Sequence, residues 1–271
     1  MSTTVLWEEL LPREFHERLA DEPTAYLPMG LCEPHGHAAA FGLDTIKAEW
    51  LCEQSARRHG GIVAPTQAWQ IHETGYHRPW LAEVIDEAVN PRLGSVPPDV
   101  LLRMLLFQVR ALVNAGFRRV IILTGHNANQ HDLRLVAEEV LRDRPLQMIV
   151  VSDPELVVPD FPGDHAGRYE LSQLMHIRPE LVRLERVSDR ESSPLGRFAQ
   201  GDDAGRASAD YGREILEASL TELARRIEGL GDHGPEVTPL GIAETDAIWA
   251  RVLARQDEWC TLNEVELPLG E

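Results

Sequence analysis

The chain has 271 residues, of which 43% are apolar, and its formal net charge at pH 7 is -18. This length and apolar content favour a folded protein with a substantial core over a disordered chain, and the negative charge disfavours binding to nucleic acid phosphates. No apolar run reaches membrane-spanning length, the N-terminus lacks a leader pattern, and the three cysteines form no C-x-x-C pair. We therefore expect a cytoplasmic protein with neither a membrane nor a nucleic acid as partner.

Strands and helices are predicted to alternate along the chain. Buried strands are indicated over residues 25–30, 62–64, 118–124 and 147–151. Helices are indicated from residue 45 to the glycines at 60–61, and over 97–116, 133–141, 167–174 and 212–227. Residues 67–94 and 188–210 have the composition of loops, the second one exposed. The alternation predicts an α/β fold in which helices sandwich a mostly parallel central sheet.

The first candidate site is Glu33-Pro34-His35, which follows the first predicted strand and precedes Asp44. In extended chain, residues two apart project to the same side, so Glu33 and His35 can face one ligand. Imidazole and carboxylate together suit zinc, manganese or iron. A plain helix N-cap at Asp44 and a loop role for His37 are the alternatives.

Two further candidates lie at the ends of later elements. His126 follows a glycine directly after the third predicted strand, where ligands of parallel sheets bind. Alternatively, His126 only forms a hydrogen bond within its own loop. His165 and Glu170 lie five residues apart at a predicted loop-to-helix junction, so both can face one pocket. Alternatively, Glu170 is a first-turn carboxylate favoured by the helix dipole and His165 is a surface residue.

Taken together, the three blocks resemble the creatininase family. Residues 27–36 fit L-P-x-G-x-x-E-x-H-G, with an aspartate eleven residues after the glutamate. Residues 116–120 and 125–129 are similar to G-F-x-x-[IV] and G-H-x-x-N, and residues 165–170 to H-A-G-x-x-E. The resemblance implies one creatininase-like metallohydrolase domain over residues 1–271, which hydrolyses an amide by means of two divalent ions, zinc and/or manganese, or iron. It also implies a closed homo-oligomer, with a hexamer favoured.

The resemblance also implies roles for single residues. Glu33 and His126 would bind one metal, and His35 and Glu170 the other. Asp44 would bridge the two ions.

The catalytic residues implied in the same way are His165 and Glu170. His165 would donate a proton to the leaving nitrogen while the metals activate a water molecule.

The chain departs from the family pattern in ways that argue against creatinine as the substrate. The common H-G-x-H-L-P run is replaced by residues 35–42, Ala128 stands where creatininase has a glutamate, and there is no tryptophan between Trp80 and Trp249. We expect a small-molecule amide substrate: a lactam, a ring formamide, or a peptide bond beside a modified terminus. The residues expected to face it are Trp69, His72, His77 and Trp80.

The expected enzyme hydrolyses C–N bonds that are not ordinary peptide bonds. Two alternative functions are considered beside it. A non-catalytic, metal-stabilised binding protein of the same fold would hold the ions without turnover. A nucleotide-binding protein is disfavoured because the chain has neither Gly-rich phosphate-binding motif. The apolar terminal residues either pack against a symmetric neighbour or against their own chain: Trp7, Leu10, Leu11, Phe15, Trp249 and Trp259.

Overall fold

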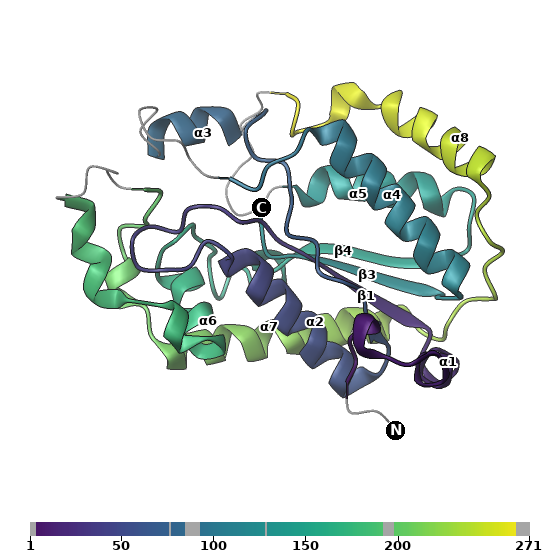
Figure 1. The fold of residues 1–271 in the computed structure, drawn as a ribbon, viewed down its shortest axis with the longest axis horizontal. Helices are drawn as coiled ribbons and strands as arrows, with labels where there is room; N and C mark the ends of the chain where they lie inside the picture. The colour runs from purple at the N-terminus through teal and green to yellow at the C-terminus, as the bar shows by residue number, and fades with distance from the viewer. Residues whose placement is uncertain (1–3, 76, 85–92, 128, 192–197, 264–271) are drawn as a thin grey trace.

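Four parallel strands form the centre of the structure, a computed structural model that describes residues 4–75, 77–84, 93–127, 129–191 and 198–263. They are β1 (Thr24–Met29), β2 (Ile62–Val63), β3 (Arg119–Thr124) and β4 (Gln147–Ser152), in the order β2-β1-β3-β4. Helices lie on both faces of this sheet (Figure 1). The predicted α/β fold with a parallel central sheet is confirmed.

The central strands are buried on both faces because their apolar residues occupy both sets of alternating positions. In β1, Leu27 and Met29 point into one core, whereas Tyr26 points into the other. In β3, Ile122 belongs to the first core and Ile121 to the second. Such continuous apolar runs are typical of strands that are covered on both sides by helices.

Each face of the sheet has its own set of helices. On one face lie α2 (Leu43–His59), α6 (Arg168–Ile177) and α7 (Ala209–Gly229), and on the other α4 (Pro98–Ala115), α5 (Gln130–Leu141) and α8 (Ile242–Leu253) (Figure 1). The predicted ends of α2 and α4 are confirmed, since their C-cap residues are Gly60 and Gly116, and Gly116 takes a left-handed φ of 103°. Among the described residues, no helix has the length and apolar character to cross a membrane.

Several elements differ from the prediction. The supposed loop over 67–94 contains α3 (His77–Val84), and helix α1 (Pro12–Asp21) precedes β1. Short 3-10 helices cover Trp7–Glu9, Pro154–Leu156, Pro179–Leu181, Leu184–Glu191, Ala204–Arg206 and Gln256–Glu258.

The prediction that residues 188–210 form an exposed loop is wrong for residues 198–200, although Asp202, Gly205 and Arg206 are exposed as expected. Phe198 and Ala199 are buried, and Gln200 is fully buried. The carbonyl of Phe198 accepts a hydrogen bond from the Gly36 amide, and Gln200 Oε1 accepts one from the His37 amide. The polar composition suggested solvent, but this segment packs against the loop that carries His35. Residues 192–197 lie outside the described residues.

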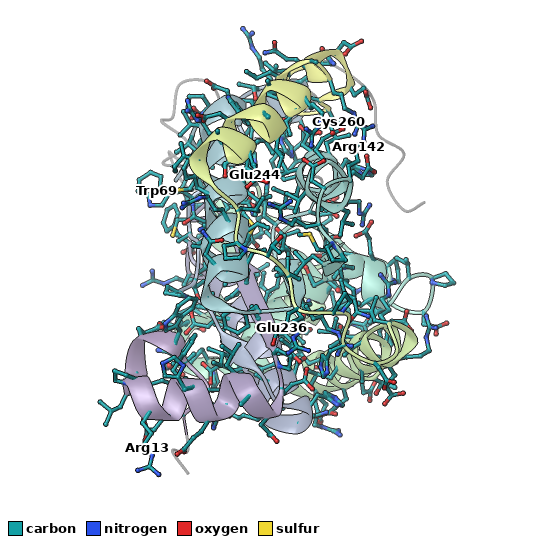
Figure 2. The ribbon with its side chains drawn as sticks, turned by 90° about the vertical axis from the view of Figure 1, so that its right-hand side faces the viewer. Arg13, Trp69, Arg142, Glu236, Glu244 and Cys260 are labelled. Carbon is teal, nitrogen blue, oxygen red and sulfur yellow. The ribbon has the colours of Figure 1, made fainter. Side chains whose placement is uncertain are left out.

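The apolar residues of the terminal segments pack largely on their own chain. The Trp7 and Phe15 rings lie 5.7 Å and 5.8 Å from the Phe117 ring, and Trp259 is fully buried beside Trp249. Helix α1, which carries Arg13, and helix α8, which carries Glu244, lie at opposite ends of the molecule (Figure 2). Of the terminal residues considered above, Leu11 is the one that remains mostly exposed. The apolar terminal residues therefore give little support to an interface with a symmetric neighbour.

Candidate metal centre

The candidate site lies where β1 and β3 end, and two glycines allow helix α2 to approach there. A Cβ built on Gly125 would overlap the Asp44 carbonyl oxygen, and one on Gly30 would overlap the Thr45 backbone. The first turn of α2 therefore rests directly on the carboxyl ends of the two strands. This contact brings Asp44 beside the residues that follow each strand.

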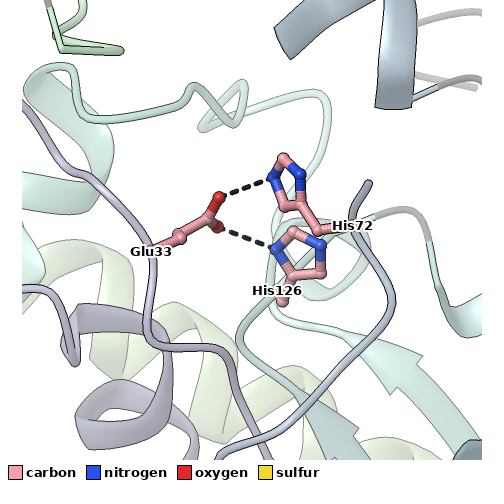
Figure 3. Close-up of side chains that lie close together, drawn as sticks. All are labelled: Glu33, His72 and His126. Carbon is pink, nitrogen blue, oxygen red and sulfur yellow. Dashed lines mark hydrogen bonds and ion pairs between the residues drawn. The ribbon is translucent and has the colours of Figure 1, made fainter. Parts of the chain in front are cut away.

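The first group of potential ligands is Glu33, His72 and His126, whose ligand atoms all lie within 4.8 Å of one another. Figure 3 shows the Glu33 carboxylate facing both imidazoles. Its Oε2 lies 2.7 Å from His72 Nε2, and its Oε1 lies 2.9 Å from His126 Nδ1. The structure thus brings together Glu33 and His126, which the sequence paired, and adds His72, which the sequence assigned to substrate binding.

The second group of potential ligands is His35, Asp44 and Glu170. His35 Nε2 lies 3.1 Å from Asp44 Oδ1 and 3.5 Å from Glu170 Oε2. Its other ring nitrogen, Nδ1, lies 3.1 Å from the Glu33 carbonyl oxygen, which fixes the orientation of the ring. The second pair expected from the sequence, His35 and Glu170, is therefore also close in space.

Asp44 belongs to the second group and also faces the first. Its Oδ1 faces His35, while its Oδ2 lies 3.4 Å from His126 Nδ1. The N-cap residue of α2 is Gly42, and Asp44 is a buried residue of the first turn, so the N-cap alternative is wrong. A carboxylate with one oxygen toward each imidazole has the geometry that a bridging ligand requires.

Lys47 is a member of the site that sequence reasoning missed. Its Nζ lies 2.7 Å from Glu170 Oε1, 3.3 Å from Asp153 Oδ1 and 3.9 Å from Asp44 Oδ1. The side chain is only 1% exposed. Asp153 follows β4 and also accepts a hydrogen bond from the Tyr169 hydroxyl. The spacing of Lys47 three residues after Asp44, on the same side of α2, was the available signal.

The ionisable ligands perturb one another strongly. Burial alone would raise the pKa of Glu33, but the facing His72, His126 and His165 hold it well below its usual value. Burial would likewise lower the pKa of His126, yet the Glu33 and Asp44 carboxylates raise it to about 10.

The second group shows the same balance. Burial opposes charge on His35, but Asp44, Glu170 and Glu33 raise its pKa to about 9. The pKa of Glu170 falls to about 2, because Lys47 and His35 outweigh the effect of burial.

His165 forms a third group of potential ligands with Glu33 and His35, and it is neither fully buried nor on the open surface. Its ring stacks on that of His35, with 4.8 Å between centroids, and its Nδ1 lies 3.9 Å from Glu33 Oε1. The Nε2 lies 2.9 Å from the Pro34 carbonyl oxygen, and the side chain is 23% exposed. Burial lowers the pKa of His165, which favours its neutral imidazole. The surface alternative for this residue does not hold.

The four residues expected to face a substrate divide into two sets. The Trp80 ring, on α3, contacts His165 at 4.8 Å and His72 at 5.7 Å between centroids. The His77 ring stacks on His72 at 4.8 Å. Trp69, by contrast, is 55% exposed and projects outward from the surface (Figure 2). No ring contact found among the described residues links Trp69 to these histidines.

The loop that carries His72 is held by side chains of helix α5. Asn129 Nδ2 donates to Gln70 Oε1 and to the Ile71 carbonyl, at 3.0 Å each. Asn129 is the N-cap residue of α5, but its side chain makes no capping bond.

A second support of this loop comes from the segment that follows α8. Asp132 accepts hydrogen bonds from the Cys260 and Thr261 amides and from the Thr261 hydroxyl. The Thr261 carbonyl in turn accepts one from the Thr74 hydroxyl. Thr74 is therefore tied to Thr261, and through Thr261 to Asp132 of α5.

The side chains present suit divalent cations. The buried Asp44 Oδ2 and His126 Nε2 have no hydrogen-bond partner in the described part of the chain. Four buried carboxylates share the region, and without metal their charges are offset by Lys47 and by the protonated His35 and His126. Buried charges of this kind are paired or coordinate metals, and imidazole with carboxylate is a donor set for zinc and manganese. His37 lies outside the three ligand groups found in the described residues.

The sequence profile of the Creatininase family, described as creatinine amidohydrolase, matches residues 8–227. The chain belongs to the creatininase family. The matched region includes the four strands and all three ligand groups, while α8 and the segment over 259–261 follow it.

Two creatininase relatives differ in the compound for which they are named. Creatinine amidohydrolase of Pseudomonas putida is 26% identical over 265 residues, which cover 84% of this chain and 97% of that protein. The 3-dehydro-scyllo-inosose hydrolase of Thermotoga maritima is 31% identical over 127 residues, which cover 46% of this chain and only 36% of that protein.

Solved creatininase structures share the fold. The crystal structure of creatinine amidohydrolase superposes with a TM-score of 0.70 at 23% identity, covering 86% of this chain and 100% of that one. A manganese form of creatininase and a Zn-Zn form of a glutamate-to-glutamine mutant each give 0.68 at 22% identity, with the same coverage.

Proposed function

We propose that this protein is a binuclear metal-dependent amidohydrolase that cleaves a C–N bond of a small amide by means of metal-activated water. The observation that carries the proposal is Asp44, whose two oxygens face His35 and His126. Each oxygen adjoins a group with a further carboxylate, Glu170 in one case and Glu33 in the other. Such a set exceeds the needs of one tetrahedral ion.

In this proposal, Glu33, His72 and His126 hold one cation and His35 and Glu170 the other, with Asp44 bridging. Zinc and manganese are the metals we propose, because creatininase itself has forms with each; iron suits the same donors. When bound, two such ions supply a hydroxide near neutral pH and a Lewis acid for the substrate carbonyl.

His165 is the residue we assign to proton transfer. It lies beside both ligand groups, through His35 and through Glu33. A neutral imidazole, which its lowered pKa favours, would first accept a proton from the attacking water and then donate it to the leaving nitrogen. An amide nitrogen leaves poorly without that proton. Glu170, the other catalytic candidate, acts here as a ligand.

The substrate is proposed to be a small amide that is not creatinine, either another cyclic amide or a formamide. A mutant creatininase has been solved with creatine, whereas the Thermotoga relative is named for an inosose. The family assignment therefore leaves the substrate open. In this chain Ala128, which lies outside the described residues, stands where creatininase has a glutamate. Trp80 and His77 are the aromatic residues that pack against the ligand histidines and would contact a bound ring.

A single-domain chain assembled as a homo-oligomer, with a hexamer favoured, completes the proposal. Its support is the family assignment, because the terminal aromatic residues pack within the chain. Light scattering on a sizing column tests it. A species of 30.4 kDa that zinc or manganese leaves unchanged would exclude the oligomer.

The decisive test combines elemental analysis with a substrate panel. Purified protein is loaded with zinc or manganese, dialysed, analysed for metal per chain, and assayed against lactams and formamides. The proposal requires about two ions per chain and turnover of at least one amide. Tight metal binding with no turnover on the panel would favour a non-catalytic binding protein. One ion per chain, with no change in Asp44→Ala, would contradict the binuclear site.

A further inference from the structure

Lys47 provides a fixed positive charge inside the ligand cluster. It lies on α2 three residues after Asp44, and its side chain is only 1% exposed. Its Nζ ion-pairs with Asp44, Asp153 and Glu170. A buried ammonium without such partners would be strongly unfavourable, so these carboxylates keep it in place.

The ammonium is not placed evenly between the two ligand groups. Its contact with Asp44 is to Oδ1, the oxygen that faces His35, and its partner Glu170 belongs to the group of His35 as well. The Glu33 carboxylate instead uses its two oxygens on His72 and His126. The charge of Lys47 therefore acts mainly on one of the two candidate metal positions.

Lys47 also restricts how Glu170 can bind a cation. The Nζ donates to Oε1 at 2.7 Å, and the Ala166 amide donates to Oε2 at 2.8 Å. Of the two oxygens, Oε2 is the one 3.5 Å from His35 Nε2. Glu170 thus presents one oxygen to the position, whereas a free carboxylate presents two.

We propose that Lys47 makes the two metal positions unequal, so that the position of Glu33, His72 and His126 fills first and the position of His35 and Glu170 binds its cation more weakly. This inference rests on the binuclear site proposed above. Lys47 is a positioning residue in this proposal, because it acts through Glu170 and through its charge. Like charges a few ångströms apart in a poorly screened interior repel strongly, and the repulsion is doubled for a divalent cation.

A purely orienting role for Lys47 makes the opposite prediction. If its only effect were to hold Glu170 in place, removal of Lys47 would free Glu170 to move and would weaken binding of the second cation. If repulsion dominates, removal of the charge strengthens binding of the second cation. The sign of the change in affinity therefore separates the two roles.

The test is calorimetric titration of Mn²⁺ into metal-stripped full-length protein and into its Lys47→Met variant, which keeps the side-chain length but removes the charge. For the unaltered protein we expect two binding steps with dissociation constants at least about tenfold apart. In Lys47→Met the weaker step should tighten by about tenfold or more. The tighter step should change by less than about threefold.

Two variants serve as controls. Arg57→Met removes a positive charge from the exposed side of the same helix, where Arg57 pairs with Glu53, and should leave both steps unchanged. Lys47→Met combined with Asp153→Asn removes the buried ion pair as a unit, so it protects against a folding defect of the single variant. We expect the double variant to tighten the weaker step as well, although by less.

The outcomes distinguish this inference from the proposal beneath it. The role of Lys47 would be overturned, and the binuclear site left intact, if Lys47→Met binds two ions with unchanged affinities or binds the weaker ion less tightly. One ion bound by the unaltered protein and two by Lys47→Met would support the inference in its strongest form. One ion bound by every variant would overturn the binuclear site itself.

Discussion

The His165 imidazole stacks on that of His35, with 4.8 Å between the ring centroids and 20° between the ring planes. This contact holds His165 against a candidate metal ligand, outside the group formed by His35, Asp44 and Glu170 but within the group that it forms with Glu33 and His35. A residue in that position can exchange a proton with the reacting groups while the ions stay bound. A ligand role and a proton-transfer role for His165 predict different metal contents for a variant that lacks its imidazole.

Replacement of His165 by Ala should lower kcat by a factor on the order of 10² to 10⁴, because the leaving nitrogen loses its proton donor. The metal content should stay near that of the unaltered protein. Steady-state kinetics on whichever amide the panel identifies, with elemental analysis of the same sample, checks both statements. If metal is lost in parallel with activity, His165 is a ligand and its assigned role is wrong.

Gly125→Ala should destabilise the protein and reduce its metal content together. The added Cβ would overlap the Asp44 carbonyl oxygen, so the first turn of α2 must move away from β3. Overpacking of this kind costs about 1–3 kcal/mol of unfolding free energy. Gly229→Ala is the matched control, because its Cβ meets nothing within 4 Å at the end of α7. Urea unfolding and metal analysis should give the control variant the stability and metal content of the unaltered protein. Equal stability and metal content in the two variants would disprove the explanation.

The metal-free protein should lose stability as the pH rises from neutral to about 10. The pKa values of His126 and His35 are raised to about 10 and about 9, from a usual value of 6.5. A raised pKa stabilises the fold fully below pH 6.5, and that contribution is lost as the pH passes through 9 to 10. Metal-loaded protein should not show this loss, since its ligand imidazoles are already neutral. The check is the Tm of both forms measured between pH 6 and 10. If the Tm of the metal-loaded form falls in parallel with that of the metal-free form, the interpretation is wrong.

Creatinine should be a poor substrate. Creatininase has a glutamate at the position of Ala128, and this chain has no tryptophan between Trp80 and Trp249. We expect kcat/KM on creatinine to fall below the ordinary enzymatic range, which begins at about 10⁴ M⁻¹s⁻¹. A coupled assay of fully metal-loaded protein measures it, and a value above that limit would refute the expectation.

The sequence predicted the sheet and the positions of the ligand groups because both depend on local pattern. Continuous apolar runs marked β1 and β3, and the residues directly after them had to meet at one edge of a parallel sheet. This reasoning placed Glu33 and His126 together, and the structure has them 2.9 Å apart. Their role as ligands stays a prediction until metal is measured.

The features that the sequence did not predict depend on contacts between distant segments. Lys47 looked like an ordinary helix residue, because nothing nearby indicated that Asp153 and Glu170 would surround it. The part played by His72 was missed for the same reason, since its partner Glu33 lies on another loop. Trp69 and Trp80 looked equivalent in sequence, but only Trp80 lies on a helix that turns it toward the histidines.

The hydrogen bonds that join Thr74 to Thr261, and Thr261 to Asp132, impose an order on the making of this protein. A nascent chain leaves the ribosome from its N-terminus, and domains generally fold in that direction. The strands, α2 and α6 are complete long before residue 261 is synthesised, so most of the ligand cluster can assemble on the ribosome. The loop that carries His72 is tied down only afterwards. The restraint on the His72 loop is therefore added only after residue 261 has been translated, and a chain that folds its sheet before then still lacks that restraint.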